Sequence, residues 1–561
     1  MADISSISSV RSLVHIAKAK QITDVILSPG SRNAPFILSF SALDSFHCTS
    51  VLDERSAGFI ALGIAQQKRK PVLLSCTSGS AMINYTPAMV EAFHQNIPLI
   101  VITADRPAEW IDQGEGQSIR QTQLMDGVFV KNFNLVWAQD KDQEWLNERL
   151  INEAFITVEQ EQKPVQINVP LREPLYNTEA FDEKDALKLI NKKAIERSLP
   201  YESRDFFEKK WEEAKSIIIL VGQSNSVSGL EDQLRNLMND QRIVVLTETT
   251  ANLYHLGFVC CIDRTIDSFM GSENQADFAP ELLITIGGNL ISKKLKAFLR
   301  SHKSMINDHW HLGEELLDTF QSLTEIVDVN PAEFFRQIAT EGNPSEYGTK
   351  WKKQFFLTEQ KHIEFLANAP YSDLKVFELL MEFVPDHAQL QMGNSSVVRY
   401  IQLFNHLRNV SYFGNRGVSG IEGCVSTAVG AAMATENMVI HISGDQAFRY
   451  DSNALAQEDL PQNLRIVVIN NGGGNIFRII DGPKQHENSE AFIEKVDTRS
   501  IQKLVEYHNV NYAKADNLEE LGTALIQMIS PDQTTPMVLE VFTPRIESPE
   551  LLKEYFGFLN G

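Results

Sequence analysis

Cysteine is scarce in this chain, and long apolar runs are missing from it. Only five cysteines occur among 561 residues, an odd number without C-x-x-C spacing. We therefore expect neither a disulfide framework nor a zinc knuckle, and we predict a reducing cytoplasm as the location. The apolar stretch 97–104 is far shorter than the roughly 20 residues that span a bilayer. Membrane insertion is not expected.

Basic residues are too few to balance the acidic ones. Lys and Arg number 51 against 73 Asp and Glu, which gives a formal net charge of -22, and no long Lys/Arg run offsets it. Nucleic acid is a poor candidate partner for such a surface. The hydrophobic fraction of 43% is typical of a globular protein with more than one core. The length predicts roughly three to five domains.

Short apolar runs recur between helical patterns. They are continuous rather than alternating, which indicates strands covered on both faces, as in parallel sheets with crossover helices. The predicted fold class is α/β. Polar stretches near 177–204 and 340–361 divide the chain into three predicted domains, 1–185, 200–342 and 365–561. The runs lie at 25–28, 71–75, 99–104, 217–221, 242–246, 282–286, 439–442 and 464–469.

Two of these runs end at residues that could hold a metal ion. One stops at Gly444-Asp445 and the other at Asn470-Asn471, followed by three glycines. Ligands bind beyond the carboxyl ends of strands in open parallel sheets, so the two loops should face one crevice. Carboxylate, amide and backbone oxygens suit Mg²⁺ or Ca²⁺ bridging to a diphosphate. Each dipeptide alone is typical of a turn, but the spacing of the pair favours the metal site.

Gly-Asp followed about 25 residues later by Asn-Asn resembles the thiamine diphosphate-binding signature of the decarboxylase and carboligase superfamily. The signature usually continues as G-D-G, whereas Gln446 follows Asp445 here. The resemblance implies thiamine diphosphate as cofactor, with Mg²⁺ or Mn²⁺ bound by Asp445, Asn471 and Gly473. It also implies cofactor contacts from Ser395, Ile476 and Phe477.

Four segments of the first third carry a closer resemblance. They read SPGSRNAPF (28–36), VLDERSAGFIALGIAQ (51–66), SCTSGSAMINYTPAMVEA (75–92) and ITADRPAEWIDQGEGQSIRQ (102–121). Glu54 alone would be read as a cap-region residue at a helix start. In the superfamily this glutamate hydrogen-bonds the aminopyrimidine of thiamine diphosphate and promotes loss of the C2 proton, so the resemblance implies that Glu54 is catalytic.

Together with QMGNSSVVRY (391–400) and FGNRGVSGIEGCVSTAVGAA (413–432), these segments resemble the 2-succinyl-5-enolpyruvyl-6-hydroxy-3-cyclohexene-1-carboxylate synthase (MenD) family of menaquinone biosynthesis. The resemblance implies a transferase that decarboxylates 2-oxoglutarate and adds the resulting carbanion to isochorismate in a 1,4 fashion. Both substrates are dicarboxylates, and arginine suits bidentate recognition of carboxylates. Implied substrate residues are Ser31, Arg32, Arg106, Gln117, Lys293, Lys294, Arg399 and Arg416.

Other readings of the chain remain open at this point. A different carboligase or a 2-oxoacid decarboxylase would share Glu54, Asp445 and Asn471 but lack the arginine set. A non-catalytic thiamine diphosphate-binding protein belongs to another class, and the presence of Glu54 and Asp445 argues against it. The stretch VGQSNS (221–226) follows a strand without G-x-G-x-x-G, so bound FAD or NAD is not expected. The superfamily implies a homodimer or a dimer of dimers.

Overall fold

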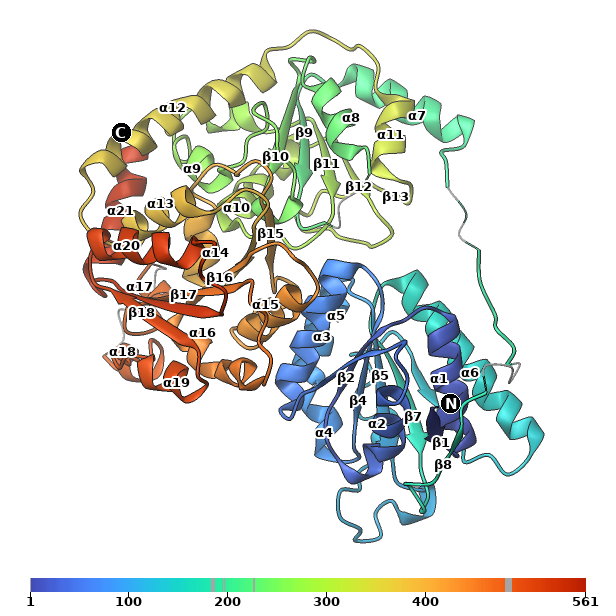
Figure 1. The fold of residues 1–561 in the computed structure, drawn as a ribbon. Coiled ribbons are helices and arrows are strands. Elements are labelled where there is room, and N and C mark those ends of the chain that lie inside the picture. The colour runs from blue at the N-terminus through green and yellow to red at the C-terminus, as the bar shows by residue number, and fades with distance from the viewer. Residues whose placement is uncertain (1, 183–186, 194, 196, 225–227, 480–486) are drawn as a thin grey trace.

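The structure is a computed structural model that describes residues 2–182, 187–193, 195, 197–224, 228–479 and 487–561. Three parallel sheets flanked by helices follow one another along the chain, shown in blue, green and orange to red in Figure 1. The predicted α/β class is confirmed, and each of the eight predicted apolar runs contributes a strand. The predicted boundary at 185 and the end of the 221–226 stretch lie outside the described residues.

The first sheet has six strands in the order β3-β2-β4-β5-β7-β6, and a separate antiparallel pair joins β1 to β8. The apolar runs fill the centre of this sheet, because crossover helices cover both of its faces. The elements are β1 (Asp3–Ser5), α1 (Ser8–Ala19), β2 (Asp24–Leu27), α2 (Ala34–Ser41), β3 (His47–Ser50), α3 (Glu54–Lys68), β4 (Val72–Cys76), α4 (Ser80–Asn84), α5 (Thr86–Gln95), β5 (Leu99–Asp105), β6 (Asn132–Asn134), α6 (Lys141–Glu161), β7 (Val165–Pro170) and β8 (Thr178–Ala180).

The middle sheet has five parallel strands in the order β10-β9-β11-β12-β13. A buried apolar cluster lies on each of its faces. Helix α12 (Tyr347–Asn368) occupies the polar stretch that separates the second and third predicted domains. The elements before it are α7 (Tyr201–Glu213), β9 (Ile217–Val221), α8 (Leu230–Leu237), β10 (Ile243–Thr247), α9 (Ile262–Asp267), β11 (Leu282–Ile286), α10 (Lys293–Ser301), β12 (Asp308–Leu312), β13 (Glu325–Val327) and α11 (Pro331–Ile338).

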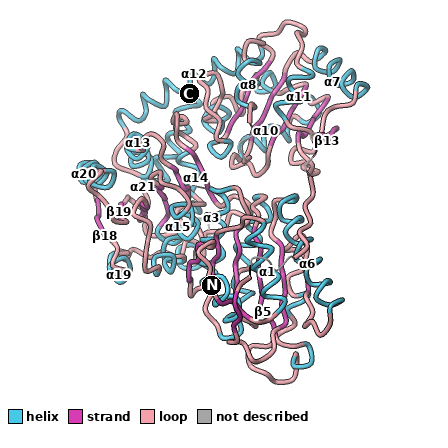
Figure 2. The backbone as a smooth tube through the Cα atoms, turned by 45° about the vertical axis from the view of Figure 1, so that its right-hand side comes forward, coloured by secondary structure: helices cyan, strands magenta, loops and turns pink. Residues whose placement is uncertain are grey.

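The last sheet repeats the strand order of the first, as β15-β14-β16-β17-β19-β18. Figure 2 shows the two sheets as separate sets of magenta strands. The elements are α13 (Asp373–Phe383), β14 (Gln389–Met392), α14 (Ser396–Ile401), β15 (Ser411–Gly414), α15 (Cys424–Met433), β16 (Val439–Gly444), α16 (Asp445–Tyr450), β17 (Leu464–Asn470), α17 (Ile476–Ile479), α18 (Ser489–Phe492), α19 (Gln502–Tyr507), β18 (Asn511–Ala515), α20 (Leu518–Ile529), β19 (Met537–Phe542) and α21 (Glu547–Asn560).

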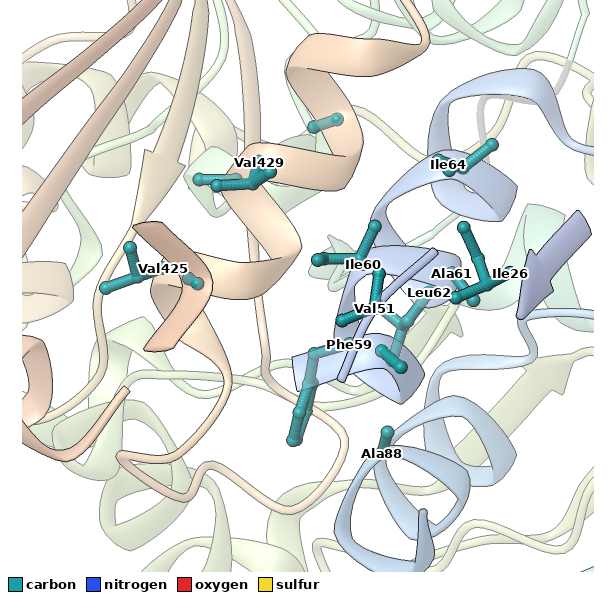
Figure 3. Close-up of a cluster of buried hydrophobic side chains, with 14 of the residues drawn as sticks. Ile26, Val51, Phe59, Ile60, Ala61, Leu62, Ile64, Ala88, Val425 and Val429 are labelled. Carbon is teal, nitrogen blue, oxygen red and sulfur yellow. The ribbon is translucent and has the colours of Figure 1, made fainter. Parts of the chain in front are cut away.

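Helices α3 and α15 join the first domain to the last through glycines. A Cβ atom on Gly63 would lie 2.1 Å from the carbonyl oxygen of Thr427, and one on Gly430 would lie 2.0 Å from that of Ile60. The two backbones can approach this closely only because neither glycine has a side chain. Residues of both helices, including Ile60 and Val429, belong to one buried apolar cluster (Figure 3). This crossing fixes how the two outer domains sit in one chain.

Within the described residues, no helix is both long and apolar enough to cross a membrane.

Candidate active site

Strands β14 and β16 end side by side at the point where the strand order of the last sheet reverses direction. A Cβ atom on Gly393, directly after β14, would lie 2.7 Å from the carbonyl oxygen of Ile442, so the loop needs glycine there. Asp445 begins α16 directly after β16 and is 1% exposed. Its Oδ2 lies 3.0 Å from Nη1 of Arg449. Burial raises the pKa of Asp445 to about 7, although Arg449 acts in the opposite direction.

Asn471 follows β17, the next strand of the sheet, and is also buried. Its Nδ2 donates a hydrogen bond to Oδ2 of Asp373 at 3.1 Å, which leaves its Oδ1 as the end that can bind a cation. Gly472 and Gly473 have φ angles of 76° and 149°, which favour glycine. The Gly473 carbonyl accepts one hydrogen bond, from the N–H of Asn475 at 2.9 Å, and keeps a second lone pair.

These oxygens fit a hard divalent cation. No group of three or more His, Cys, Asp or Glu side chains in the described part of the chain could hold a metal alone. Asp445, Asn471 and Gly473 would instead offer one carboxylate, one amide oxygen and one backbone carbonyl. Mg²⁺ is commonly bound by one or two carboxylates together with phosphate oxygens of a ligand. The site therefore suits a cation that is shared with a diphosphate.

Gln446, which replaces the expected glycine of the signature, has a structural function. Its Nε2 donates hydrogen bonds to the carbonyl oxygens of Glu494 at 2.6 Å and Lys495 at 2.8 Å. The Glu494 carbonyl also accepts from the N–H of Gly474 at 2.7 Å. Gln446 and Gly474 therefore hold the 494–495 segment from two sides, next to the glycine loop.

Glu54 is the first residue of α3, where the Asp53 side chain caps the helix by accepting from the N–H groups of Arg55 and Ser56. The Glu54 carboxylate is half-buried and accepts a hydrogen bond from Nδ2 of Asn84 at 3.3 Å. A helix N-terminus stabilises a carboxylate in this position. Within the described chain no hydrogen bond or ion pair joins Glu54 to Asp445.

The two predicted substrate-binding arginines of the first domain, Arg32 and Arg106, follow the carboxyl ends of β2 and β5. Arg32 is 6% exposed, and its Nη1 donates to the carbonyl of Leu171 at 2.5 Å. Burial lowers its pKa, and the charge of Arg106 lowers it further. Arg106 donates to the carbonyl of Gly116 at 2.8 Å. Ser31 is exposed beside Arg32, and Gln117 follows Gly116 with a φ angle of 53°. The structure therefore brings these four predicted residues to one end of the first sheet.

Arg399 and Arg416 lie beside the switch point of the last sheet. Nη1 of Arg416 donates to Oδ1 of Asn394 at 2.7 Å, and Arg399 donates to the carbonyl of Ser395. Burial lowers the pKa of both arginines. Ser395 itself has a φ angle of 70° at the start of α14. Two predicted arginines are thus held next to the loop that carries Ser395.

Lys293 and Lys294 begin α10 of the middle domain. Lys293 is exposed, whereas the Lys294 ammonium forms an ion pair with Asp267 and lies 3.5 Å from the centre of the Phe556 ring. Burial raises the pKa of Asp263, and the charges of Lys294 and Arg399 oppose that effect. Lys294 and Arg399 therefore act on one carboxylate, while Lys293 forms no hydrogen bond or ion pair among the described residues.

The sequence analysis did not predict several residues that lie near the predicted site residues. Asn475 is 4% exposed, and neither polar atom of its side chain has a hydrogen-bond partner among the described residues. The same holds for the hydroxyls of Thr77 and Ser78, which follow β4 in the first domain. Asn394 joins the Ser395 loop to Arg416, and its only sequence signal is its place within the segment 391–400 that carries the family resemblance. Ile476 and Phe477 are half-buried next to Asn475.

A cavity of 710 Å³ is lined by residues of all three domains. Gln95, Gln223 and Lys296 line it, but among the described residues that do so there is no member of the predicted site.

Two family models match the outer domains. The thiamine pyrophosphate enzyme N-terminal binding domain matches residues 8–124, and the corresponding C-terminal binding domain matches residues 391–541. The two matches include Glu54 in the first domain and Asp445 and Asn471 in the last.

Relatives of known name match nearly the whole chain. A 2-succinyl-5-enolpyruvyl-6-hydroxy-3-cyclohexene-1-carboxylate synthase of Flavobacterium johnsoniae is 41% identical over 554 residues, which cover 98% of each chain. The synthase of the same name from Porphyromonas gingivalis is 36% identical over 578 residues, which cover 100% of this chain and 98% of the relative.

A solved structure shares the fold at low sequence identity. Benzoylformate decarboxylase from Polynucleobacter necessarius superposes with a TM-score of 0.68 and 16% identity, covering 96% of this chain and 98% of that one. The likeness extends through all three domains.

Proposed function

The chain belongs to the family of 2-succinyl-5-enolpyruvyl-6-hydroxy-3-cyclohexene-1-carboxylate synthases, and on that premise we propose which of its residues perform the reaction. It is a thiamine diphosphate-dependent transferase of menaquinone biosynthesis. The reaction decarboxylates 2-oxoglutarate and adds the remaining four-carbon fragment to isochorismate in a 1,4 fashion. The observation that carries the assignment of residues is the placement of the half-buried Arg399 and Arg416 at the same sheet edge as Asp445.

The last domain holds the cofactor's diphosphate. Asp445, Oδ1 of Asn471 and the carbonyl of Gly473 would hold Mg²⁺ or Mn²⁺, which would offset the negative charge of the diphosphate. Ser395, Ile476 and Phe477 contact the cofactor from the adjoining loops. When bound, thiamine diphosphate supplies the carbon nucleophile and accepts the electron pair that remains after CO₂ leaves.

Glu54 holds a proton at the aminopyrimidine ring. A half-buried carboxylate at a helix start can accept and return a proton through a short hydrogen bond. Asn84, which donates to Glu54 at 3.3 Å, keeps the carboxylate in place.

The arginines bind the carboxylates of the two substrates. Arg32 and Arg106 act from the first domain with Ser31 and Gln117, and Arg399 and Arg416 act from the last domain with Lys293 and Lys294. Burial of the guanidinium groups strengthens their attraction for a carboxylate, because less water screens the charges. Four guanidinium groups contributed to one site would also favour substrates with two carboxylates each.

The test is CO₂ release from 2-oxoglutarate with thiamine diphosphate and Mg²⁺, measured with and without isochorismate. We expect consumption of 2-oxoglutarate to depend on isochorismate and on both cofactors. Turnover of pyruvate in its place would contradict the substrate assignment and favour another carboligase or decarboxylase.

We also propose a cytoplasmic homodimer, or a dimer of dimers, with each site shared between two chains. All five cysteines are free, which agrees with a reducing compartment. Leu52, two residues before Glu54, is 80% exposed, and Tyr450, whose carbonyl oxygen accepts a hydrogen bond from the Arg55 side chain, is 51% exposed. Apolar surface of this kind beside Glu54 supports coverage by a second copy.

Mixing two inactive variants tests the shared site. A mixed dimer of Glu54→Gln and Asp445→Ala chains forms one site with neither lesion and one with both. Random reassortment should then restore roughly a quarter of wild-type activity. No rise in activity after demonstrated subunit exchange would show that each chain completes its own site.

A further inference from the structure

Asp373 is a buried carboxylate at the start of helix α13. It begins α13 and is 2% exposed, and in the described part of the chain no Lys, Arg or His forms an ion pair with it. Its Oδ1 accepts a hydrogen bond from the Thr543 hydroxyl, and its Oδ2 accepts from Nδ2 of Asn471 at 3.1 Å. Its own backbone N–H donates to the Ser548 hydroxyl at 3.0 Å. Burying an acid in this way is costly, which calls for a reason beyond helix capping.

The contact with Asn471 decides how that amide is oriented. The oxygen and nitrogen of an asparagine side chain have nearly the same size, so hydrogen bonds alone fix which end points where. A carboxylate can only accept, and therefore Nδ2 of Asn471 must face Asp373. The carbonyl end of the amide is then directed away from Asp373. A flipped amide would place two oxygens against each other and offer the cation an N–H donor that cannot coordinate it.

We propose that Asp373 is a positioning residue that holds the amide of Asn471 with its oxygen toward the divalent cation. This inference rests on the proposed function, because it assumes that Asn471 is a metal ligand. Groups that orient metal ligands in other proteins commonly change metal affinity by about 10- to 100-fold when they are replaced. Asp373 acts through Asn471 and touches neither the cation nor the substrates.

The experiment measures Mn²⁺ binding in the presence of thiamine diphosphate, from the loss of the free Mn²⁺ signal in electron paramagnetic resonance. Asp373→Ala should weaken Mn²⁺ binding by about 10- to 100-fold. Asp373→Asn preserves the shape of the buried side chain but can present either end to Asn471, so its affinity should fall between those of the wild type and the alanine variant. Thr543→Val is the matched control, since it removes the other side-chain donor to Asp373 and leaves the contact with Asn471.

A double-mutant cycle separates positioning from general damage to the fold. In an Asn471→Ala background the amide is absent, so adding Asp373→Ala should change Mn²⁺ affinity no further. Additive losses, or an Asp373→Ala affinity within twofold of the wild type, would overturn the positioning role. Failure of the wild type to bind Mn²⁺ with the cofactor would instead overturn the proposed metal site itself. Melting temperatures of all variants show whether each one is folded.

Discussion

The first and last domains are built on the same strand order, yet they present different side chains at corresponding places. Where the last domain has Asp445 directly after β16, the first domain has Thr77 and Ser78 after β4, which is the corresponding strand. All three side chains are buried, but only Asp445 can provide a negative charge. Only the last domain could therefore hold a divalent cation at this position.

The helices that follow the second strand of each sheet differ in a complementary way. Helix α3 begins with Glu54, whereas α15 begins with Cys424 behind a glycine in the left-handed conformation. The first domain thus has a half-buried carboxylate, Glu54, at a helix start, and the last domain has a buried one, Asp445, after a strand end. One architecture can serve both chemistries because the loops at its switch point are free to vary.

The largest effects should come from replacing Glu54 or Asp445. Glu54→Gln should lower turnover on the order of a hundredfold or more while cofactor still binds, because only the proton-holding group is lost. Asp445→Ala should instead weaken thiamine diphosphate binding steeply, with partial recovery at high Mg²⁺. Calorimetry with the cofactor and C2 proton exchange on the bound cofactor distinguish the two.

Identical behaviour of the two variants would contradict the different functions predicted for Glu54 and Asp445. Wild-type C2 exchange in Glu54→Gln would remove Glu54 from catalysis, and unchanged cofactor affinity of Asp445→Ala at low Mg²⁺ would remove Asp445 from the metal site.

The crossing of α3 and α15 predicts a matched pair of destabilising changes. Gly63→Ala and Gly430→Ala each place a methyl group about 2 Å from a backbone oxygen of the other helix. We expect each to lower the free energy of unfolding by on the order of 2 kcal/mol, since backbone cannot move aside as a side chain can. Urea unfolding measures the loss.

Gly522→Ala is the control for this pair. Gly522 lies inside α20 with no atom within 4 Å of the added methyl group, so alanine should stabilise the protein by about 0.5–1 kcal/mol. Equal effects at all three glycines would show that helix propensity, and not the crossing, governs them.

A smaller effect is expected from Gln446, which has no counterpart in the first domain. Gln446→Ala removes two hydrogen bonds to the 494–495 segment, each of which contributes about 1 kcal/mol to stability. The contact between this segment and the glycine loop should therefore open more often. Hydrogen exchange at the amide of Gly474 should become faster, because its acceptor is the Glu494 carbonyl. An unchanged exchange rate at Gly474 would mean that the glycine loop keeps its contact with Glu494 without Gln446.

The middle domain shares the first four positions of the strand order and supplies a pH-dependent test. Glu248 is fully buried and accepts from the N–H groups of Ile291 and Ser292, each at 2.7 Å. Burial raises its pKa from 4.5 to about 7. A raised pKa means that its stabilising contribution is complete below pH 4.5 and is lost as the pH rises through 7.

The stability of the wild type relative to Glu248→Gln should therefore fall between pH 4.5 and about pH 7, by on the order of 3 kcal/mol, and change little above that. Denaturant unfolding at several pH values gives this difference directly. Parallel stability curves for the two proteins would contradict the raised pKa.

The strands that the sequence revealed are those buried on both faces. Runs such as 217–221 and 282–286 are continuously apolar because helices cover both sides of each sheet. Strands β3 and β14 are among those that the sequence analysis did not predict, for two different reasons. His47–Ser50 is a partly exposed edge strand, and Gln389–Met392 alternates polar and apolar residues although all four are buried.

The side-chain contacts of Asp373 and Gln446 could not be predicted from apolar runs in the sequence. Asp373 lies 98 residues before Asn471, and Gln446 contacts a segment 48 residues further along the chain. Nothing in the local pattern around Asp373 marks it as more than a helix-start residue. The catalytic and binding roles of Glu54, Asp445 and the arginines stay predictions, for which the structure supplies neighbours and burial.

By itself, the sequence determined the α/β class, the central strands and the places where Asp445 and Asn471 follow strand ends, because these depend on apolar periodicity and on neighbouring residues. Only the tertiary structure decided the close crossing of α3 and α15, the orientation of the Asn471 amide and the fastening of the glycine loop by Gln446. Those features depend on distances between residues far apart in the chain, which are set when the sheets and helices pack together.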